Sequence, residues 1–128
     1  MFKRSLNDVE NGECFVNWGN GANHRLAVEA GRMGFTVCRT VVHAGSESLL
    51  EYKNNLEFCY CIDGEGEVED MQGNVLLLRK GDIYVLDKHG RHFLRAAQGG
   101  DLIVVCVFNP PLKDTERCSL SGKEPSSC

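Results

Sequence analysis

One apolar run of the sequence carries acidic and sulfur-containing side chains at a spacing that could serve chemistry. Side chains alternate between the two faces of a β-strand, so Glu57, Cys59 and Cys61 in the run 56–62 share one face. If Glu57 points inward, the short thiols beside it leave room for a ligand. The pattern therefore predicts a cavity with a polar base. By the same alternation, other runs pair their side chains as Tyr84 with Leu86, Cys106 with Phe108, and Cys38 with Thr40.

The elements that must position these groups are predicted to be short strands. Apolar or alternating runs are separated by turn residues such as Asp63-Gly64 and Lys80-Gly81, and long helical periodicity is absent. Since 128 residues fit one domain, the pattern predicts a single all-β sandwich or barrel. The runs are 13–17, 24–29, 34–43, 56–62, 66–71, 75–79, 82–86, 92–96 and 101–108.

Composition and charge exclude several classes of partner. The net charge is -4 and no basic patch with interleaved aromatic residues occurs, so nucleic acid is not expected. The N-terminus lacks an apolar signal region, and no apolar run approaches the roughly 18 residues of a membrane span. The cysteines number seven, an odd count, which indicates mostly free thiols in a reducing, cytoplasmic protein.

Two blocks of the sequence have the spacing of the two cupin motifs. Glu51 and Lys53 stand where cupins usually have histidine ligands, so the standard three-histidine metal site is absent. Glu57 and His92 remain at ligand positions. The first block contains Gly45, Glu51, Lys53, Glu57 and Gly64, and the second contains Gly81, Asp87, His89 and His92.

Longer segments resemble the ectoine synthase family, whose members have the cupin fold. The similarity extends from about residue 13 to residue 118, and its segments together are much more specific than the cupin spacing. Shorter matches are NW at 17–18, RL at 25–26 and MGF at 33–35. The main segments are YKNNLE at 52–57, YCIDGEGEVED at 60–70, GDIYVLDKHGRH at 81–92 and VCVFNPPL at 105–112.

The resemblance implies a fold, a reaction and a metal. The fold would be one cupin-type, jelly-roll-like β-barrel over residues 1–128, and the polar segment 117–128 is expected to be a flexible tail. The reaction would be cyclisation of N-γ-acetyl-2,4-diaminobutyrate, with loss of water, to the osmoprotectant ectoine. The resemblance implies Fe(II), with another divalent metal as the alternative, held by Glu57, Tyr84 and His92. By analogy with other cupins, we expect a homodimer.

The resemblance also implies which residues meet the substrate. Arg25 could bind a substrate carboxylate, because a planar guanidinium pairs with carboxylates through two hydrogen bonds. Trp18 and Phe108 could exclude water from the reaction. The implied catalytic groups are Glu116 for proton transfer and Tyr52 as a positioning or acid group, and the implied substrate contacts include Trp18, Arg25, Thr40, Leu86 and Phe108.

Four positions in or near the expected site depart from the family pattern. Asn55, Cys118 and Glu51 stand where histidine is usual, and Asp114 stands where the family has glycine. These departures leave a second hypothesis open, in which a diverged cupin binds a small amino-acid-like ligand with altered or little catalysis.

Other interpretations of single residues are structural. Trp18 and Phe108 could be plain core, and Arg25 could form a surface ion pair of little energetic value. The thiols could instead hold a soft metal, with Cys59 and Cys61 joined by Cys38 or Cys106, although strand neighbours two apart do not reproduce C-x-x-C zinc geometry. The remaining histidines are expected at the surface or in turns, namely His24, His43 and His89.

Overall fold

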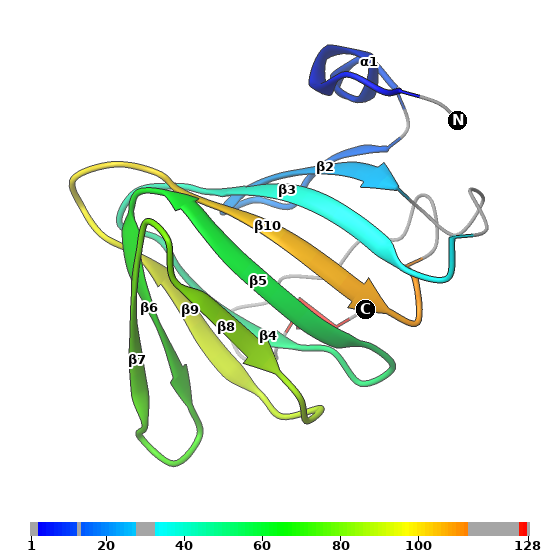
Figure 1. The fold of residues 1–128 in the computed structure, drawn as a ribbon. Coiled ribbons are helices and arrows are strands. Elements are labelled where there is room, and N and C mark those ends of the chain that lie inside the picture. Colours follow the sequence, from blue (N-terminus) through cyan, green and yellow to red (C-terminus); the bar gives the residue numbers. More distant parts are fainter. Residues whose placement is uncertain (1–2, 13, 28–32, 113–125, 128) are drawn as a thin grey trace.

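The structure is a computed structural model that describes residues 3–12, 14–27, 33–112 and 126–127. Two β-sheets face each other, and one short helix lies beside them (Figure 1). In chain order the elements are α1 (Leu6–Glu10), β1 (Phe15–Asn17), β2 (Gly21–Ala27), β3 (Thr36–Val42), β4 (Glu47–Glu51), β5 (Leu56–Asp63), β6 (Glu65–Asp70), β7 (Val75–Arg79), β8 (Ile83–Leu86), β9 (His92–Ala96), β10 (Leu102–Asn109) and β11 (Ser126–Ser127).

The two sheets contain six and five strands. The first has the order β1-β2-β3-β10-β5-β8, and the second has the order β11-β4-β9-β6-β7. Pairing is antiparallel throughout, except that β11 runs parallel to β4. Among the described residues, no strand of one sheet pairs with a strand of the other. The all-β prediction is confirmed, but the sheets do not close into the continuous barrel that was expected.

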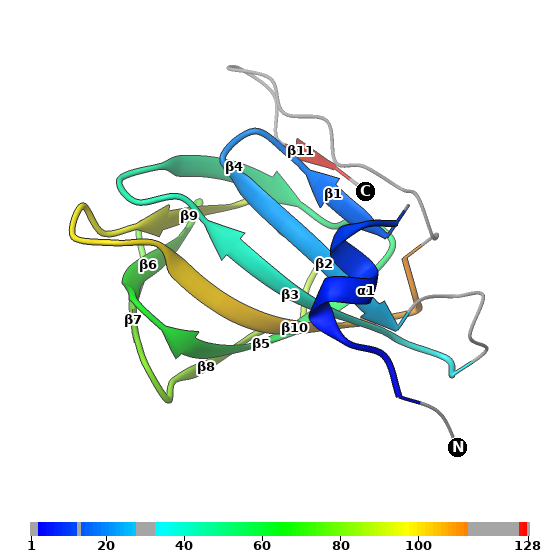
Figure 2. The ribbon, with the colours of Figure 1, turned by 90° about the horizontal axis from the view of Figure 1, so that it is seen from above.

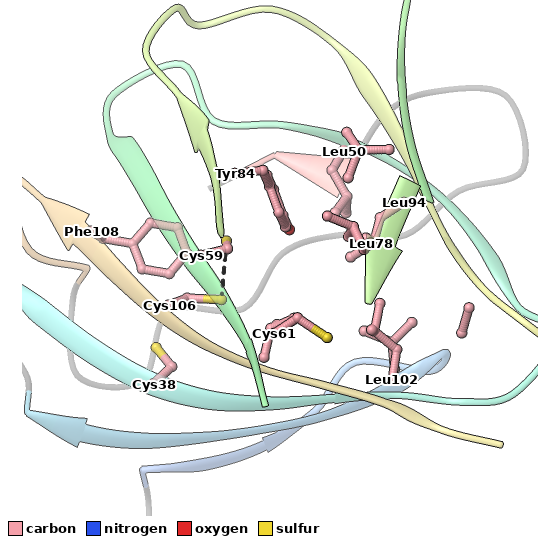
Figure 3. Packing of buried hydrophobic residues seen from close by; sticks show 14 of the residues in the cluster. Cys38, Leu50, Cys59, Cys61, Leu78, Tyr84, Leu94, Leu102, Cys106 and Phe108 are labelled. Carbon is pink, nitrogen blue, oxygen red and sulfur yellow. Dashed lines mark hydrogen bonds between the residues drawn. The ribbon is translucent and has the colours of Figure 1, made fainter. Parts of the chain in front are cut away.

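The hydrophobic core fills the space between the sheets. Burial alternates along β10, so that every second side chain points toward the opposite sheet. Leu102, Val104, Cys106 and Phe108 are buried in this way, and Leu94 on β9 meets them from the other side (Figure 3). In the β-sheet register, Cys106 is opposite residues of both β3 and β5. Its two partners are Cys38 and Cys59, which places three thiols in a row across the sheet.

Helix α1 lies over β2, outside the six-stranded sheet (Figure 2). The Ser5 hydroxyl accepts a hydrogen bond from the Asp8 amide, and the Asp8 carboxylate accepts one from the Ser5 amide, which caps the first turn. Val9, on the helix itself, is buried. None of the helical segments that the structure describes is long and apolar enough to span a membrane.

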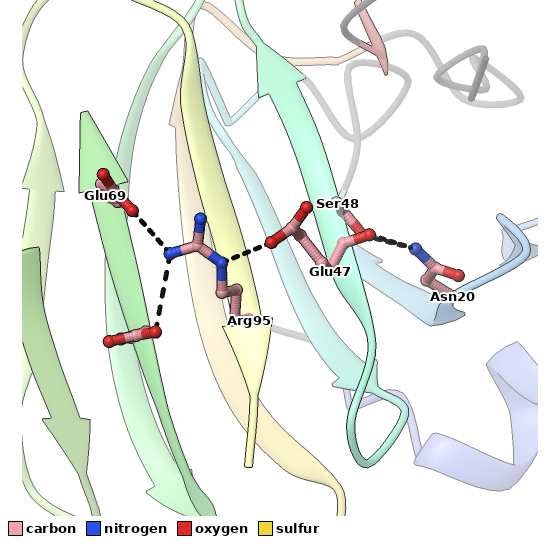
Figure 4. A network of polar contacts seen from close by, with 6 residues as sticks. Asn20, Glu47, Ser48, Glu69 and Arg95 are labelled. Atoms are coloured by element: carbon pink, nitrogen blue, oxygen red, sulfur yellow. Dashed lines mark hydrogen bonds and ion pairs between the residues drawn. The ribbon is translucent and has the colours of Figure 1, made fainter. Parts of the chain in front are cut away.

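A charged network holds three strands of the five-stranded sheet together (Figure 4). The Arg95 guanidinium on β9 donates to Glu47 Oε2 on β4 at 2.6 Å and to Glu69 Oε1 on β6 at 2.8 Å. Glu67 on β6 adds an ion pair at 3.5 Å. Such pairs contribute little singly but more as a network with good geometry.

The outer side of β5 and β8 exposes large apolar side chains. We call these residues the β5/β8 outer face, and each is between 40% and 57% exposed. Strand β8 is also an edge of its sheet, so one row of its backbone groups has no strand partner among the described residues. The face consists of Leu56, Phe58, Tyr60, Ile83 and Val85.

The predicted runs agree with most of the strands but not with all. The runs 75–79 and 92–96 have the same bounds as β7 and β9, whereas β4 and α1 were not predicted. The ESLLE sequence of β4 lacks the β-branched and aromatic residues that indicate a strand. From the predicted flexible tail 117–128, Ser126–Ser127 form β11 beside β4. The tail's other residues lie outside the described ones, so its flexibility stays a prediction.

Candidate active site

A cavity lies between the sheets and is lined by side chains from eight strands and from the segments that follow β1 and β4. Seven of the residues for which the family resemblance implies a role reach it, and Leu86 and His92 lie beside it, on the wall of a neighbouring surface groove. Glu116 lies outside the described residues. The seven are Trp18, Arg25, Thr40, Tyr52, Glu57, Tyr84 and Phe108.

Glu57 is the buried acid of this cavity. It lies on β5, in register with Phe108 of β10 and Leu86 of β8, and is 6% exposed. Burial raises the pKa of its carboxyl to about 7, against the opposing hydrogen bonds from the Cys106 and Cys59 thiols. The carboxyl therefore gains or loses its proton near neutral pH.

Two of the thiols are in direct contact at the base of the cavity. Cys59 Sγ donates to Cys106 Sγ at 3.4 Å, and Cys106 Sγ lies 3.9 Å from Thr40 Oγ1 (Figure 3). Burial raises the pKa of the Cys59 thiol to about 11. The pKa of Cys106 is raised well above its usual value, first by its hydrogen bond with Cys59 and then by burial. Both groups are therefore neutral thiols in the protein alone.

Tyr84 lines the cavity from the six-stranded sheet, whereas His92 lies on the five-stranded sheet, on the wall of the neighbouring groove. Tyr84 on β8 is buried beside Cys59, its register partner, and burial raises the pKa of its phenol well above the usual value. His92 on β9 is 3% exposed, and its Nδ1 lies 3.3 Å from the Gly90 carbonyl oxygen. Burial lowers the pKa of the imidazole, opposed by that backbone contact. With Nδ1 as the donor, the buried Nε2 keeps its lone pair and has no hydrogen-bond partner among the described residues.

Aromatic and cationic side chains line other parts of the cavity. The Tyr52 ring lies 5.1 Å from the Phe108 ring and 6.2 Å from the His92 ring, between centroids. Burial and then the Glu57 charge raise the pKa of the Tyr52 phenol well above its usual value. Arg25 is 2% exposed and lines the cavity, so it is not a surface ion-pair residue. Trp18 contributes a buried indole Nε1 with no hydrogen-bond partner in the part of the chain described.

Two of the departures from the family pattern have structural roles. The Asn55 side-chain amide donates to the Pro110 carbonyl at 2.6 Å and so connects the start of β5 to the chain leaving β10. Glu51 forms ion pairs with Lys53 at 3.6 Å and Arg91 at 3.7 Å. Asp114 and Cys118 lie outside the described residues.

The structure also corrects and extends the sequence analysis. His24 was expected at the surface, but it is buried on β2, 4.8 Å from the Phe15 ring between centroids and 3.7 Å from Glu10. Asn23, which was not predicted, lines the cavity and donates to Thr40 Oγ1 at 3.0 Å. Its position two residues before Arg25 on one strand was the available signal, because such residues share a face.

Comparison with known proteins places the chain in a family. The family model described as "Ectoine synthase" matches residues 1–127. This chain belongs to the ectoine synthase family. Its relatives include an L-ectoine synthase of Desulfatibacillum aliphaticivorans, 41% identical over 128 residues, covering 98% of this chain and 97% of the relative. Another, from Vibrio parahaemolyticus, is 35% identical over 125 residues and covers 98% of each chain.

Solved structures support the same assignment for the fold. An ectoine synthase from P. lautus superposes with a TM-score of 0.85 at 37% identity, covering 91% of this chain and 83% of that one. A cupin protein from Bacteroides fragilis has a TM-score of 0.54 at 21% identity, over 61% of this chain and 67% of its own. The cupin fold expected for an ectoine synthase family member is thus confirmed, as two facing sheets that do not close.

Proposed function

We propose that this chain is an ectoine synthase, a lyase that closes N-γ-acetyl-2,4-diaminobutyrate into ectoine with loss of water. The observation that carries the proposal is the cavity. Residues from distant parts of the sequence, which the family resemblance had marked one by one, line a single space between the sheets. The family model and the named relatives, which match nearly the whole chain, support the same activity.

A divalent metal, with Fe(II) as the first candidate, would be held by Glu57, Tyr84 and His92. The donors fit such an ion, because they combine a carboxylate, a phenol and an imidazole whose buried Nε2 has no partner among the described residues. Glu57 and Tyr84 line the cavity, so an ion that they held would face its interior. When bound, the ion supplies a Lewis acid that polarises the substrate's amide carbonyl.

The remaining residues bind, fold and enclose the substrate. The buried Arg25 guanidinium would hold the substrate carboxylate, since it lines the cavity and matches that group's shape. Trp18 and Phe108 would exclude water and bring the two ends of the flexible substrate together, which lowers the barrier to ring closure. Thr40 and Leu86 complete the substrate contacts. Tyr52 would position the substrate or act as an acid, and Glu116 would move protons.

The β5/β8 outer face would be the contact of a homodimer. Five large apolar side chains are exposed together beside an unpaired sheet edge, a combination that usually marks an interaction surface. A second copy of the chain presents the same face, and closed two-fold pairs are the commonest assembly of soluble proteins. The five described free cysteines agree with a reducing, cytoplasmic location.

The test is product formation by the metal-loaded protein. We expect ectoine to form when the protein, loaded anaerobically with Fe(II), is incubated with N-γ-acetyl-2,4-diaminobutyrate and ring formation is followed by chromatography. His92→Gln should lower activity by more than the roughly 10–100-fold that loss of an outer-shell partner costs. His43→Gln, at an exposed position after β3, is the matched control and should not change it.

A folded, metal-loaded protein that makes no product would overturn the proposal. That result would favour a diverged cupin that binds a small amino-acid-like ligand, with Asn55 and Cys118 as the first positions to revert to histidine.

A further inference from the structure

Three buried side chains at the cavity bring potential metal-ligand atoms close together. A carboxylate oxygen of Glu57, Cys59 Sγ and Cys106 Sγ all lie within 4.8 Å of one another. Glu57 and Cys59 are on β5, and Cys106 faces them from β10, where the sheet pairing fixes its position. The group shares Glu57 with the metal site proposed above but contains two sulfur atoms that this site does not use.

Of the two sulfurs, that of Cys106 is placed to reach a ligand in the cavity. Cys106 is among the residues that line the cavity, whereas Cys59 lies behind it. A Glu57 carboxylate oxygen and the Cys106 sulfur lie within 4.8 Å of each other. An ion bound by Glu57 could also reach the Cys106 sulfur, because metal–sulfur and metal–oxygen bonds of about 2.3 and 2.0 Å together span a separation of this order.

Two groups beside Cys106 can donate hydrogen bonds to its sulfur. The Cys59 thiol already points its proton at Cys106 Sγ at 3.4 Å, and the Thr40 hydroxyl lies 3.9 Å away on the other side. Both groups can donate to a thiolate.

We propose that Cys106 is a thiolate ligand of the metal ion that Glu57 binds, and that Cys59 is a positioning residue that donates to this sulfur. Binding releases the thiol proton to solvent and forms one metal–sulfur bond, without oxidation or reduction. A sulfur ligand makes the site selective for borderline cations such as Fe(II), Co(II) and Zn(II) over Mg(II). The inference rests on the proposed function only in that both use Glu57 as a ligand.

The experiment uses Co(II) as the probe. Cobalt chloride is titrated anaerobically into the metal-free full-length protein, and the near-ultraviolet sulfur-to-cobalt charge-transfer band is recorded together with the cobalt bound at equilibrium dialysis. We expect the wild type to show the band and Cys106→Ser to lose it. Cys59→Ser should keep the band, because a serine hydroxyl can still donate to the sulfur.

Cys61→Ser is the matched control. Cys61 is as deeply buried on the same face of β5 as Cys59, but its sulfur contacts the Asp63 and Gly64 carbonyls instead. The charge-transfer band of the Cys61→Ser protein should equal that of the wild type.

The possible failures are distinguishable. Cobalt bound to the wild type without a charge-transfer band would overturn the thiolate ligand and leave the metal site itself standing. A band that persists in a folded Cys106→Ser protein would also overturn it. Absence of cobalt binding to the wild type would overturn the metal site of the proposed function. Because the wild-type spectrum alone can refute the inference, it does not depend on any variant folding.

Discussion

At the scale of single residues, the Glu57 carboxyl makes stability depend on pH. Burial raises its pKa from 4.5 to about 7, so the folded protein holds this proton more tightly than the unfolded chain. Wherever the folded state binds more protons, stability falls as pH rises. The metal-free protein should therefore lose stability between about pH 4.5 and pH 7, as far as this group is concerned.

Glu57→Gln should remove that loss. The amide carries no charge to bury, so we expect the metal-free variant to be more stable than the wild type at pH 8, by at most about 3 kcal/mol for a shift of this size. Urea unfolding of both proteins at pH 5 and pH 8, with a chelator present, measures the difference. An equal difference between the two proteins at both pH values would contradict the assignment.

Individual residues of the site could be predicted to different degrees. The alternation of side chains grouped Glu57 with Cys59 and Cys106 with Phe108, and in the structure all four are buried. Alternation does not reveal which residues are opposite one another on neighbouring strands, so a meeting of Cys59 with Cys106 was only one of the alternatives that the sequence left open. The role of Asn55 was also hidden, because its partner is a backbone carbonyl far away in sequence.

At the scale of elements, the Asn55 amide links the chain just before β5 to the chain just after β10. Asn55→Ala would leave the Pro110 carbonyl without this donor, and a typical intramolecular hydrogen bond contributes about 0.5–1.5 kcal/mol. We expect a loss of that size in the free energy of unfolding by urea. The neighbouring exposed residue supplies the control, since Asn54→Ala should change stability little. Equal effects of the two substitutions on the free energy of unfolding would show that this hydrogen bond does not stabilise the protein.

Strand β2 depends on a glycine at its first position. A Cβ atom at Gly21 would collide with the Val41 carbonyl on β3 and approach the Trp18 ring to 2.9 Å. We expect Gly21→Ala to destabilise the protein by roughly 1–3 kcal/mol, as overpacking does, and to shift the Trp18 fluorescence. Gly99→Ala is the control, because a Cβ atom there meets nothing within 4 Å. Thermal unfolding that is identical for both variants would refute the collision.

The strands differed in how clearly the sequence predicted them. Strands β7 and β9 were predicted with the observed bounds, because leucine, valine and phenylalanine mark them and turn residues flank them. Strand β4 was missed because its ESLLE segment has no strand propensity of its own. Its conformation depends on pairing with β9 and on the contact from Arg95 to Glu47, both of which are tertiary.

At the scale of the whole molecule, the β5/β8 outer face predicts an assembly. We expect the protein to be a dimer in solution and the double variant Ile83→Glu/Val85→Glu to be a folded monomer, because the added charges would lose hydration in the contact. Analytical ultracentrifugation measures the mass. Leu77→Glu is the control. Leu77 on β7 is 66% exposed but lies outside this face, so a charge placed there should leave the dimer intact. A monomeric wild type, or a Leu77→Glu variant that dissociates equally, would contradict the assignment.

The all-β fold class was predictable from the sequence, but whether the sheets close into a barrel was not. Short apolar runs between turns indicate a sandwich or a barrel equally well, since the two differ only in whether the outermost strands pair. That pairing depends on sheet twist and strand length, which periodicity does not reveal.

The lack of backbone pairing between the two sheets, among the described residues, has a mechanical consequence. Each sheet keeps its own ladder of backbone hydrogen bonds, and within the described residues no ladder bridges the two. Side-chain packing and the segments that connect the sheets therefore hold the two ladders against each other. We expect a change in that packing on ligand binding to leave the hydrogen exchange of the backbone amides within each ladder unchanged.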